Sequence, residues 1–360
     1  MAFTLSIHPW VHNARFDGKT WSGKFIEQKH FTPKEEEALD EEARQALANT
    51  RNSFPHLPLV NYTTQYGLGC FEGLKAYPQP DGSLKLFRPD RNCVRMASSM
   101  KGLLMPPIDE KLLLNGILET VKRNADLGFT PVYDAAWERD SWQSGAAVYI
   151  RPFTYAEPGI GVNVSRKPWV ITVCTNVSAY FVPGKNEAVT SSRIRATPNG
   201  TGWIKTAANY VISILAKSEA VNEGYMEAIF LDAATGENIE EGSSCNFFSL
   251  FPGNRLITPD LHDTILPGIT RDSIITLAKD RGLEVIEKDL PVADVMNEAI
   301  ECFVTGTAAG ITPIGSLTHK GKKSVFSSMK EDSLSMSLLK ELKGIQYGAE
   351  KDRYAWMTRV

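Results

Sequence analysis

The chain has 360 residues and a formal net charge of −3, with 42% apolar and 22% charged residues. This composition is typical of a folded globular protein, and the length predicts two domains, because one hydrophobic core rarely extends beyond about 250–300 residues. The net charge shows no global basic excess of the kind typical of nucleic-acid-binding proteins, so we expect no nucleic-acid partner.

The first 90 residues are predicted to hold a solvated segment followed by several strands. A charged run at residues 34–42 is typical of an exposed helix or loop. Apolar and aromatic residues interspersed with glycines predict strands at 60–62 and 66–77. The sequence Gln79-Pro80-Asp81-Gly82 is typical of a hairpin turn and leads into a further strand at 84–88.

Packing helices and buried strands are predicted next. Apolar residues recur at helical spacing after Asp109, which is a suitable N-cap for this helix. The apolar runs 146–152 and 169–174 predict strands, and the second run is apolar enough to be buried on both faces. Pro152 is predicted to end the first of these strands, because proline cannot donate a ladder hydrogen bond.

The second half begins after a polar stretch rich in proline and glycine at residues 180–189, which is typical of an interdomain linker. A strand is predicted at 191–194, followed by a helix from Asn209 and another that ends near Gly282. In the helix from Asn209, one apolar face is predicted to consist of Ile212, Leu215, Ala216 and Ala220. Further strands are predicted at 228–231, 247–251, 256–258 and 283–287, with the last strand at 302–305.

Strands and helices thus mix without a regular βαβ repeat, which predicts an α+β fold. We expect a small N-terminal domain at residues 1–179, a linker at 180–189 and a larger C-terminal domain at 190–360. The five cysteines are dispersed and predict reduced thiols in a cytoplasmic protein. The six histidines form no metal-binding motif, and no apolar run is long enough to span a membrane, so we expect neither a metal site nor a membrane association.

One lysine stands out by its surroundings. Lys205 lies among glycines and small residues, where backbone can pack closely around a group held by the amine, and Tyr210 follows five positions later. A lysine that attacks an aldehyde must be partly desolvated, because only the neutral amine is nucleophilic. By itself, this segment is equally compatible with an ordinary surface loop. It is not a nucleotide-binding phosphate loop, since Ile204 replaces the glycine before the lysine.

Three other segments would suit an anionic aromatic cofactor. The helix start at Gly268-Ile269-Thr270 offers free backbone N–H groups, a hydroxyl and the positive end of a helix dipole. Thr307, after Gly306, offers a second hydroxyl in a turn. Glu241 lies at the end of a strand, where a carboxylate could keep a pyridine nitrogen protonated. Each feature alone could equally be ordinary capping, turn or edge-strand chemistry.

Together these segments resemble the branched-chain amino acid aminotransferases. The motifs that carry the resemblance are Arg195 to Tyr210, Glu240 to Asn246, Ile265 to Arg271 and Thr305 to Ala309, with Tyr66, Phe71 to Gly73, Leu86 to Pro89 and Tyr149 to Pro152 in the first half. The resemblance extends from about Asn61 to Gly315. It implies the fold type IV architecture of pyridoxal-phosphate enzymes, with a small α/β domain, a larger domain built on a β-barrel-like sheet, and a homodimer.

The resemblance also implies roles for single residues. Lys205 would be the Schiff-base lysine and the proton-transfer catalyst, Tyr210 would hydrogen-bond the phenolic oxygen of pyridoxal 5'-phosphate, and Glu241 would contact its ring nitrogen. Arg95 would bind the phosphate. The full set of implied cofactor contacts is Arg95, Arg195, Lys205, Tyr210, Glu241, Ser244, Ile269, Thr270 and Thr307. The implied substrate contacts are Tyr66, Phe71, Tyr149, Arg151, Thr307 and Ala308.

The implied reaction is transamination of L-leucine, L-isoleucine and L-valine with 2-oxoglutarate, giving branched-chain 2-oxo acids and L-glutamate by a ping-pong course. Aromatic walls would favour an aliphatic side chain. Tyr149 and the amides of Thr307-Ala308 would bind the α-carboxylate, and Arg151 could meet the γ-carboxylate of glutamate. The positions of the redox-active cysteine pair of mammalian members are Ala309 and Thr312 here, so no thiol switch of that type is expected.

Other functions remain open on the same scaffold. A D-amino acid aminotransferase and an aminodeoxychorismate lyase would share the cofactor site. The segments Tyr149 to Pro152 and Gly306 to Ala309 favour the branched-chain interpretation over both. A catalytically silent binding protein is a further alternative, and the presence of Lys205, Tyr210 and Glu241 together argues against it.

Overall fold

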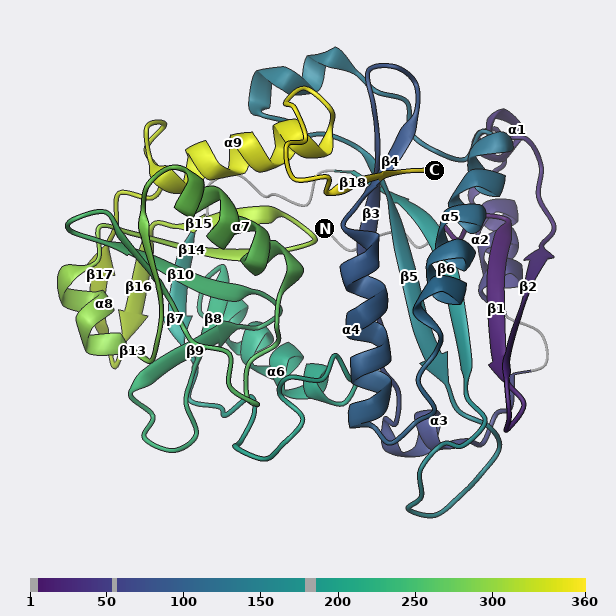
Figure 1. Ribbon diagram of the computed structural model, residues 1–360, viewed down its shortest axis with the longest axis horizontal. Helices are drawn as coiled ribbons and strands as arrows, with labels where there is room; N and C mark the ends of the chain where they lie inside the picture. The colour runs from purple at the N-terminus through teal and green to yellow at the C-terminus, as the bar shows by residue number, and fades with distance from the viewer. Residues whose placement is uncertain (1–5, 54–56, 179–185) are drawn as a thin grey trace.

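The structure, a computed structural model, describes residues 6–53, 57–178 and 186–360. Two curved sheets lie side by side, each with helices packed against it (Figure 1). Strands and helices mix as the α+β prediction requires, and an antiparallel sheet stands beside a curled, half-barrel sheet. The predicted fold class is therefore confirmed.

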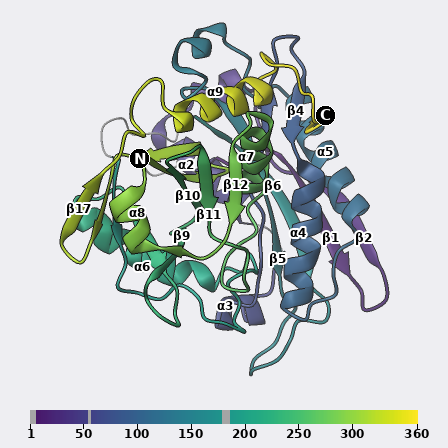
Figure 2. The same cartoon turned by 60° about the vertical axis from the view of Figure 1, so that its left-hand side comes forward.

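The first sheet has seven strands within the described residues, and all neighbouring strands are antiparallel. Helices α4 (Pro89–Gly102) and α5 (Glu110–Asp126) run alongside it (Figure 2). Their buried residues, such as Met96 and Ile117, pack on Leu74 and Ile150 of the sheet in one apolar core. In spatial order the strands are β18 (Met357–Arg359), β4 (Leu84–Phe87), β3 (Leu74–Pro78), β5 (Ala147–Tyr155), β6 (Trp169–Val177), β1 (Trp10–Phe16) and β2 (Trp21–Glu27).

The second sheet is larger and mixes parallel with antiparallel pairs. Its main path is β12 (Glu284–Glu287), β11 (Arg255–Thr258), β10 (Asn246–Phe251), β9 (Asn238–Gly242), β8 (Glu227–Leu231), β7 (Glu187–Thr190), β16 (Ser316–His319) and β17 (Lys322–Val325). Off this path lie β13 (Leu290–Pro291), β14 (Glu301–Gly306) and β15 (Gly310–Ile314). The helices of this half are α6 (Asn209–Asn222), α7 (Ile269–Asp280), α8 (Val292–Glu298) and α9 (Leu334–Gln346).

Three predictions in the first sheet are wrong. The strand predicted at 66–77 begins only at Leu74, as β3, because Tyr66 ends a short helix that Gly67 terminates in a left-handed conformation. Residues 60–62 do not form a strand, because the Asn61 side chain accepts hydrogen bonds from the N–H groups of Thr63 and Thr64 and thereby caps helix α3 (Tyr62–Tyr66). Pro152 does not end its strand, since β5 continues to Tyr155. The Pro152 carbonyl accepts from Glu72 N–H, so the edge of β5 at Pro152 faces the irregular 70–72 segment. This segment does not continue a regular ladder, so the N–H that proline lacks is not needed there.

The second sheet also departs from the sequence predictions. The strand predicted at 191–194 lies earlier, as β7 at Glu187–Thr190, and therefore begins inside the predicted linker. Strand β14 is not the last, because β15, β16, β17 and β18 follow it. In α6, Ala216 and Ala220 are buried but Leu215 is 43% exposed, since the helix packs on β8 through its small residues.

Several local predictions are confirmed. The Asp109 side chain accepts from Leu112 N–H at 2.8 Å and caps α5. The five cysteines are unpaired, and four of them are buried. The domain boundaries stay a prediction, because residues 179–185 of the linker region lie outside the described residues.

Across the part of the chain that the structure describes, no helix is long and apolar enough to cross a membrane, and no group of three metal-binding side chains comes together.

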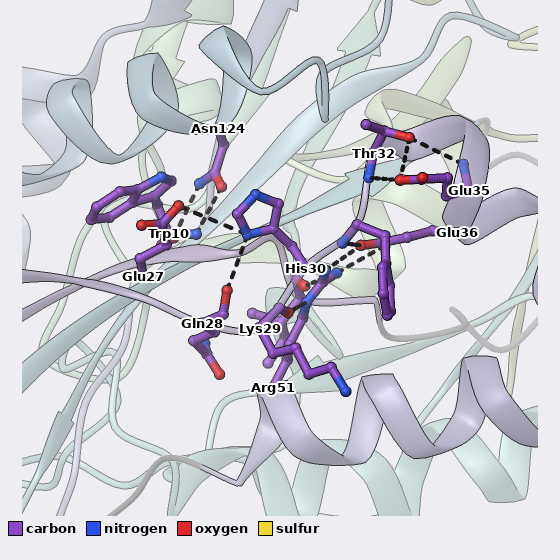
Figure 3. A network of polar contacts seen from close by, with 12 residues as sticks. Trp10, Glu27, Gln28, Lys29, His30, Thr32, Glu35, Glu36, Arg51 and Asn124 are labelled. Atoms are coloured by element: carbon purple, nitrogen blue, oxygen red, sulfur yellow. Dashed lines mark hydrogen bonds and ion pairs between the residues drawn. The ribbon is translucent and has the colours of Figure 1, made fainter.

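The predicted solvated segment contains α1 (Pro33–Glu37) and α2 (Glu41–Asn52), which are attached to the first sheet by Arg51 (Figure 3). The Arg51 side chain is only 3% exposed. It donates to the carbonyl of Lys29 at 3.0 Å and to the Glu36 carboxylate, with which it forms an ion pair. One charged residue thus joins both helices to the segment that follows β2. A short 3₁₀ helix, η1 (Ala135–Asp140), lies elsewhere in this half.

We expect Arg51→Met to lower the free energy of unfolding by about 3 kcal/mol, because removing one member of a buried ion pair leaves the other charge uncompensated. Urea unfolding followed by circular dichroism measures the change. Lys122→Met is the matched control, since Lys122 pairs with Asp126 on the exposed surface of α5. The control should leave the unfolding midpoint nearly unchanged. Equal midpoints for both variants would contradict the anchoring role of Arg51.

Candidate active site

Lys205 lies where the two halves of the molecule meet. Its backbone carbonyl accepts from Phe71 N–H at 3.1 Å, and the adjacent Thr206 forms a β-bridge with Cys70. Its own N–H donates to the Ser99 hydroxyl of α4 at 3.2 Å. Ala207 N–H also donates to the Gly69 carbonyl at 2.9 Å. The lysine segment is thus held between the second half and two elements of the first.

The side-chain amine of Lys205 is surrounded by aromatic groups. Its Nζ donates to the Tyr210 hydroxyl at 2.7 Å and lies 4.9 Å from the centre of the Phe71 ring. Burial, reinforced by the charge of Arg95, lowers the pKa of Lys205 to about 8, although Glu72 acts in the opposite direction. Neutral amine is therefore well populated near physiological pH. Burial raises the pKa of Tyr210 to about 12, so its phenol stays protonated.

Glu241 lies at the end of β9, as predicted, and is only 3% exposed. It forms an ion pair with Arg195, and its Oε2 accepts from Asn246 Nδ2 at 3.2 Å. The contact of Arg195 with Oε1 does not have hydrogen-bond geometry, so Oε1 has no hydrogen-bond partner within the described residues. Burial raises the pKa of Glu241 to about 7 even though Arg195 opposes this shift.

The predicted cofactor residues gather in two neighbouring groups. Arg195, Tyr210, Glu241 and Ser244 line one small cavity. Ile269 and Thr270, at the start of α7, line a second cavity together with Thr307. The cap residue Gly268 uses no side chain to cap the helix, and a Cβ there would lie 1.9 Å from the Asn246 side-chain oxygen. Close packing at this helix start therefore requires glycine.

Arg95 reaches the same helix start but is not a free cation. Its guanidinium donates to the Pro267 carbonyl at 2.9 Å and makes two hydrogen bonds of 2.8 Å to the Glu72 carboxylate. Glu72 is fully buried and also accepts from Asn92. Sequence reasoning used Glu72 only as part of a motif and gave it no role. A buried carboxylate predicts a cationic partner, but the sequence does not say which arginine supplies it.

The predicted substrate residues divide into two sets. Phe71, Tyr149 and Arg151 lie together beside Lys205: Arg151 donates to the Tyr149 hydroxyl at 2.6 Å, and its guanidinium carbon lies 4.4 Å from the Phe71 ring centre. Tyr66, by contrast, is 46% exposed, and its hydroxyl accepts from Gly161 N–H at 2.8 Å. Tyr66 therefore contacts the exposed loop at Gly161 and is not part of the cluster of Phe71, Tyr149 and Arg151.

Comparison with known proteins agrees with this geometry. Residues 69–317 match the model of the amino-transferase class IV family. The chain belongs to the class IV aminotransferases. It is 38% identical to a branched-chain-amino-acid aminotransferase of Haemophilus influenzae over 86% of this chain and 90% of that protein, and 34% identical to branched-chain-amino-acid transaminase 1 of Bacillus subtilis over 85% and 86%.

Solved structures show the same fold. A branched-chain aminotransferase of Thermoproteus uzoniensis with norvaline superimposes with a TM-score of 0.71, at 28% identity over 85% of this chain and 95% of that one. The pyridoxal-phosphate form of a Thermobaculum terrenum enzyme covers 99% of each chain with a TM-score of 0.72 and 24% identity, which supports the fold alone. The fold type IV architecture is therefore confirmed for this class IV aminotransferase.

The cofactor of class IV aminotransferases is pyridoxal 5'-phosphate, and the residues of this member fit it. Glu241 is a buried carboxylate that Arg195 and Asn246 hold in the lining of the cavity shared with Tyr210, which suits contact with a protonated ring nitrogen. The Lys205 amine provides a nucleophile for the aldehyde. The N–H groups at the start of α7 and the Thr307 hydroxyl provide donors for a phosphate.

Proposed function

We propose that this class IV aminotransferase transfers the amino group of L-leucine, L-isoleucine and L-valine to 2-oxoglutarate, with Lys205 as the Schiff-base lysine. The products are branched-chain 2-oxo acids and L-glutamate. The observation that carries the proposal is the Lys205 amine, with its pKa lowered to about 8, held 2.7 Å from the Tyr210 hydroxyl. The names of the relatives reported above support the branched-chain substrate class.

When bound, pyridoxal 5'-phosphate supplies an aldehyde for the amino group and a ring that withdraws electrons from the substrate Cα. Lys205 Nζ has two roles: it holds the cofactor at rest, and it accepts the Cα proton when released. Tyr210, as a protonated phenol, orients this amine through their shared hydrogen bond. Both groups sit in the same sequence segment, so their spacing is fixed by the start of α6.

Glu241 would keep a proton on the ring nitrogen of the bound cofactor. Because its side chain is buried, a positively charged partner acts on its ionised form more strongly than the same partner would in water. Arg195 already contacts the carboxylate and is itself fixed by hydrogen bonds to the carbonyls of Thr264 and Gly202. Arg195 therefore keeps Glu241 from being fully protonated and fixes its orientation.

Phe71, Tyr149 and Arg151 form the substrate side of the site in this proposal. Phe71 and Tyr210 are packed with their ring centres 4.9 Å apart, which offers an apolar wall for an aliphatic side chain. Arg151 lies against the Phe71 ring, where it can pair with the γ-carboxylate of glutamate. Tyr149 and the turn at Thr307-Ala308 would hold the α-carboxylate.

A half-reaction with single amino acids tests the proposed function. Enzyme loaded with pyridoxal 5'-phosphate is mixed with L-leucine, L-isoleucine, L-valine or D-alanine, and the cofactor absorbance is followed. We expect the three L-amino acids to convert the cofactor band and D-alanine to leave it unchanged. Conversion by D-alanine alone would favour the D-amino acid aminotransferase. Release of pyruvate from aminodeoxychorismate would favour the lyase. A cofactor band that responds to none of these compounds would favour the silent binding protein.

Attachment of the cofactor should depend on pH through Lys205. Burial lowers the pKa of this lysine from 10.5 to about 8, and only the neutral amine attacks the aldehyde. Reconstitution of the apoenzyme should therefore accelerate roughly tenfold per pH unit below pH 8 and level off above it. Stopped-flow absorbance measures the rate, with N-acetyl-lysine as the control. The rate with the control should keep rising beyond pH 9, because its amine has an ordinary pKa. The same behaviour in the reconstitution of the apoenzyme would contradict the lowered pKa of Lys205.

We also propose that the enzyme is a homodimer in the cytoplasm. What supports the dimer, besides the resemblance, is the exposure of Val211, Ile214 and Val221 on α6, at 63%, 62% and 53%. A second copy of the chain would remove this apolar surface from water. Sedimentation equilibrium should give twice the chain mass of 39.8 kDa, and a single-chain mass would refute the dimer.

A further inference from the structure

Lys75 is a buried cation that the proposed reaction does not use. It lies in β3, its side chain is 8% exposed, and its Nζ donates to the carbonyl of Ala308 at 2.7 Å. Ala308 belongs to the turn between β14 and β15, in the other half of the molecule. This hydrogen bond therefore joins the first sheet to the turn that carries Thr307.

Burying an ammonium group with one neutral partner is costly. No carboxylate acts on Lys75 in the described part of the chain, and the charged group that does act on it is a second lysine, Lys343 of α9. Burial and this like charge hold the pKa of Lys75 well below its usual value. An anion bound nearby would offset both effects, so the surroundings of Lys75 suit a ligand that carries negative charge.

The turn beside Lys75 has free hydrogen-bond donors. Among the described residues, the N–H groups of Thr307, Ala308 and Ala309 have no hydrogen-bond acceptor. A planar trans peptide unit directs its carbonyl and its N–H to opposite sides. By holding the Ala308 carbonyl on one side of the turn, Lys75 fixes the peptide plane and leaves the Ala309 N–H directed to the other side. Successive free N–H groups in a turn form a site for an anion.

The sheet places Lys75 next to Tyr149. These two residues are direct partners in the β3–β5 register, so their side chains leave the same face of the sheet. The neighbouring Gly73 lies against Tyr149 as well, since a Cβ at position 73 would lie 2.2 Å from the Tyr149 hydroxyl. The segment 73–75 thus limits the space around Tyr149 through Gly73, just before β3, and holds the turn through Lys75.

We infer that Lys75 is a positioning residue for the substrate α-carboxylate: it orients the Thr307–Ala309 turn and supplies positive charge beside it. This inference rests on the proposed function, in which Tyr149 and the same turn bind the α-carboxylate. Lys75 acts through the turn and does not touch the reacting atoms. Its loss should therefore weaken the binding of carboxylates more than the reaction of amines.

Two leucine analogues separate these effects in the pyridoxal-phosphate form of the enzyme. 4-Methylpentanoate keeps the carboxylate and lacks the amine, whereas 3-methylbutylamine keeps the amine and lacks the carboxylate. In Lys75→Met, we expect the dissociation constant of 4-methylpentanoate to rise about 10- to 100-fold, the range for a lost hydrogen bond to a charged group. The rate with 3-methylbutylamine should change less than about twofold. KM for L-leucine should rise more than kcat falls.

Lys343→Met is the matched control, because it removes a neighbouring buried lysine but keeps the Lys75 hydrogen bond to Ala308. Since it also removes the like charge that acts on Lys75, it should bind 4-methylpentanoate at least as tightly as the wild type. Lys75→Arg should restore most of the binding. If Lys75→Met does not fold, the comparison of Lys75→Arg with Lys75→Gln answers the same question. Unchanged 4-methylpentanoate binding, or equal losses for both analogues, would overturn the inference. Wild-type enzyme that fails to respond to L-leucine would instead refute the proposed function.

Discussion

Lys205→Ala is expected to reduce the rate of transamination by at least about 10⁴-fold, the upper range for a single general acid–base group. The variant loses both the nucleophile for the cofactor aldehyde and the base for the Cα proton. Pyridoxal 5'-phosphate should still bind through the start of α7 and Thr307, because these groups do not depend on Lys205. Steady-state kinetics with L-leucine and 2-oxoglutarate measure the loss.

A second measurement identifies the bonded lysine directly. Borohydride reduction followed by peptide mapping should place the cofactor on the peptide that contains Lys205 and on no other. Lys101→Ala is the control for the kinetics, since Lys101 is exposed at the end of α4 and should leave the rate unchanged. A reduced adduct on another lysine, or substantial turnover by Lys205→Ala, would contradict the assignment.

Glu241→Gln is expected to slow the half-reaction with L-leucine about 10²- to 10³-fold, comparable to removing one preorganised electrostatic group from an active site. Glutamine has nearly the same shape but cannot carry the negative charge that stabilises a protonated ring nitrogen. Cofactor affinity should change little, because the phosphate contacts lie elsewhere. Rapid-mixing absorbance under single-turnover conditions measures the rate.

The adjacent Glu240 provides the control for this experiment. It is also buried, at 6% exposure, and burial raises its pKa, yet it points to the opposite face of β9 from Glu241. Glu240→Gln should therefore keep a half-reaction rate close to that of the wild type. If Glu240→Gln and Glu241→Gln were equally slow, the slower half-reaction would result from the loss of any buried carboxylate charge and not from a specific contact of Glu241. An unchanged rate in Glu241→Gln would refute a role at the ring nitrogen.

The features that the sequence located depend on short stretches of chain. Lys205 and Tyr210, which the sequence singled out in one segment, lie five residues apart at the start of one helix. Glu241 follows from the end of a single strand. In the same way, Asp109 caps α5 through the residue three positions later. Local geometry sets each of these, so a linear pattern was sufficient to find them.

The features that sequence reasoning missed depend on contacts between distant segments. Glu72 is paired with Arg95, and Lys75 holds Ala308 across 233 positions of the chain. Pro152 lies inside a strand because the 70–72 segment, not a regular strand, occupies the neighbouring edge. No periodicity or spacing reports which segments meet in this way, because side-chain partners are decided when the two sheets pack together.

Strand β18 has a consequence for the order in which the protein folds. Residues 357–359 pair with β4 in the sheet that is otherwise built from the first 177 residues. During synthesis on the ribosome, that sheet is complete only after nearly the whole chain has emerged, and until then the edge of β4 stays unpaired. The other six strands lie within residues 10–177 and can pair first, so a nascent chain exposes the edge of β4 to other strands until β18 has been synthesised.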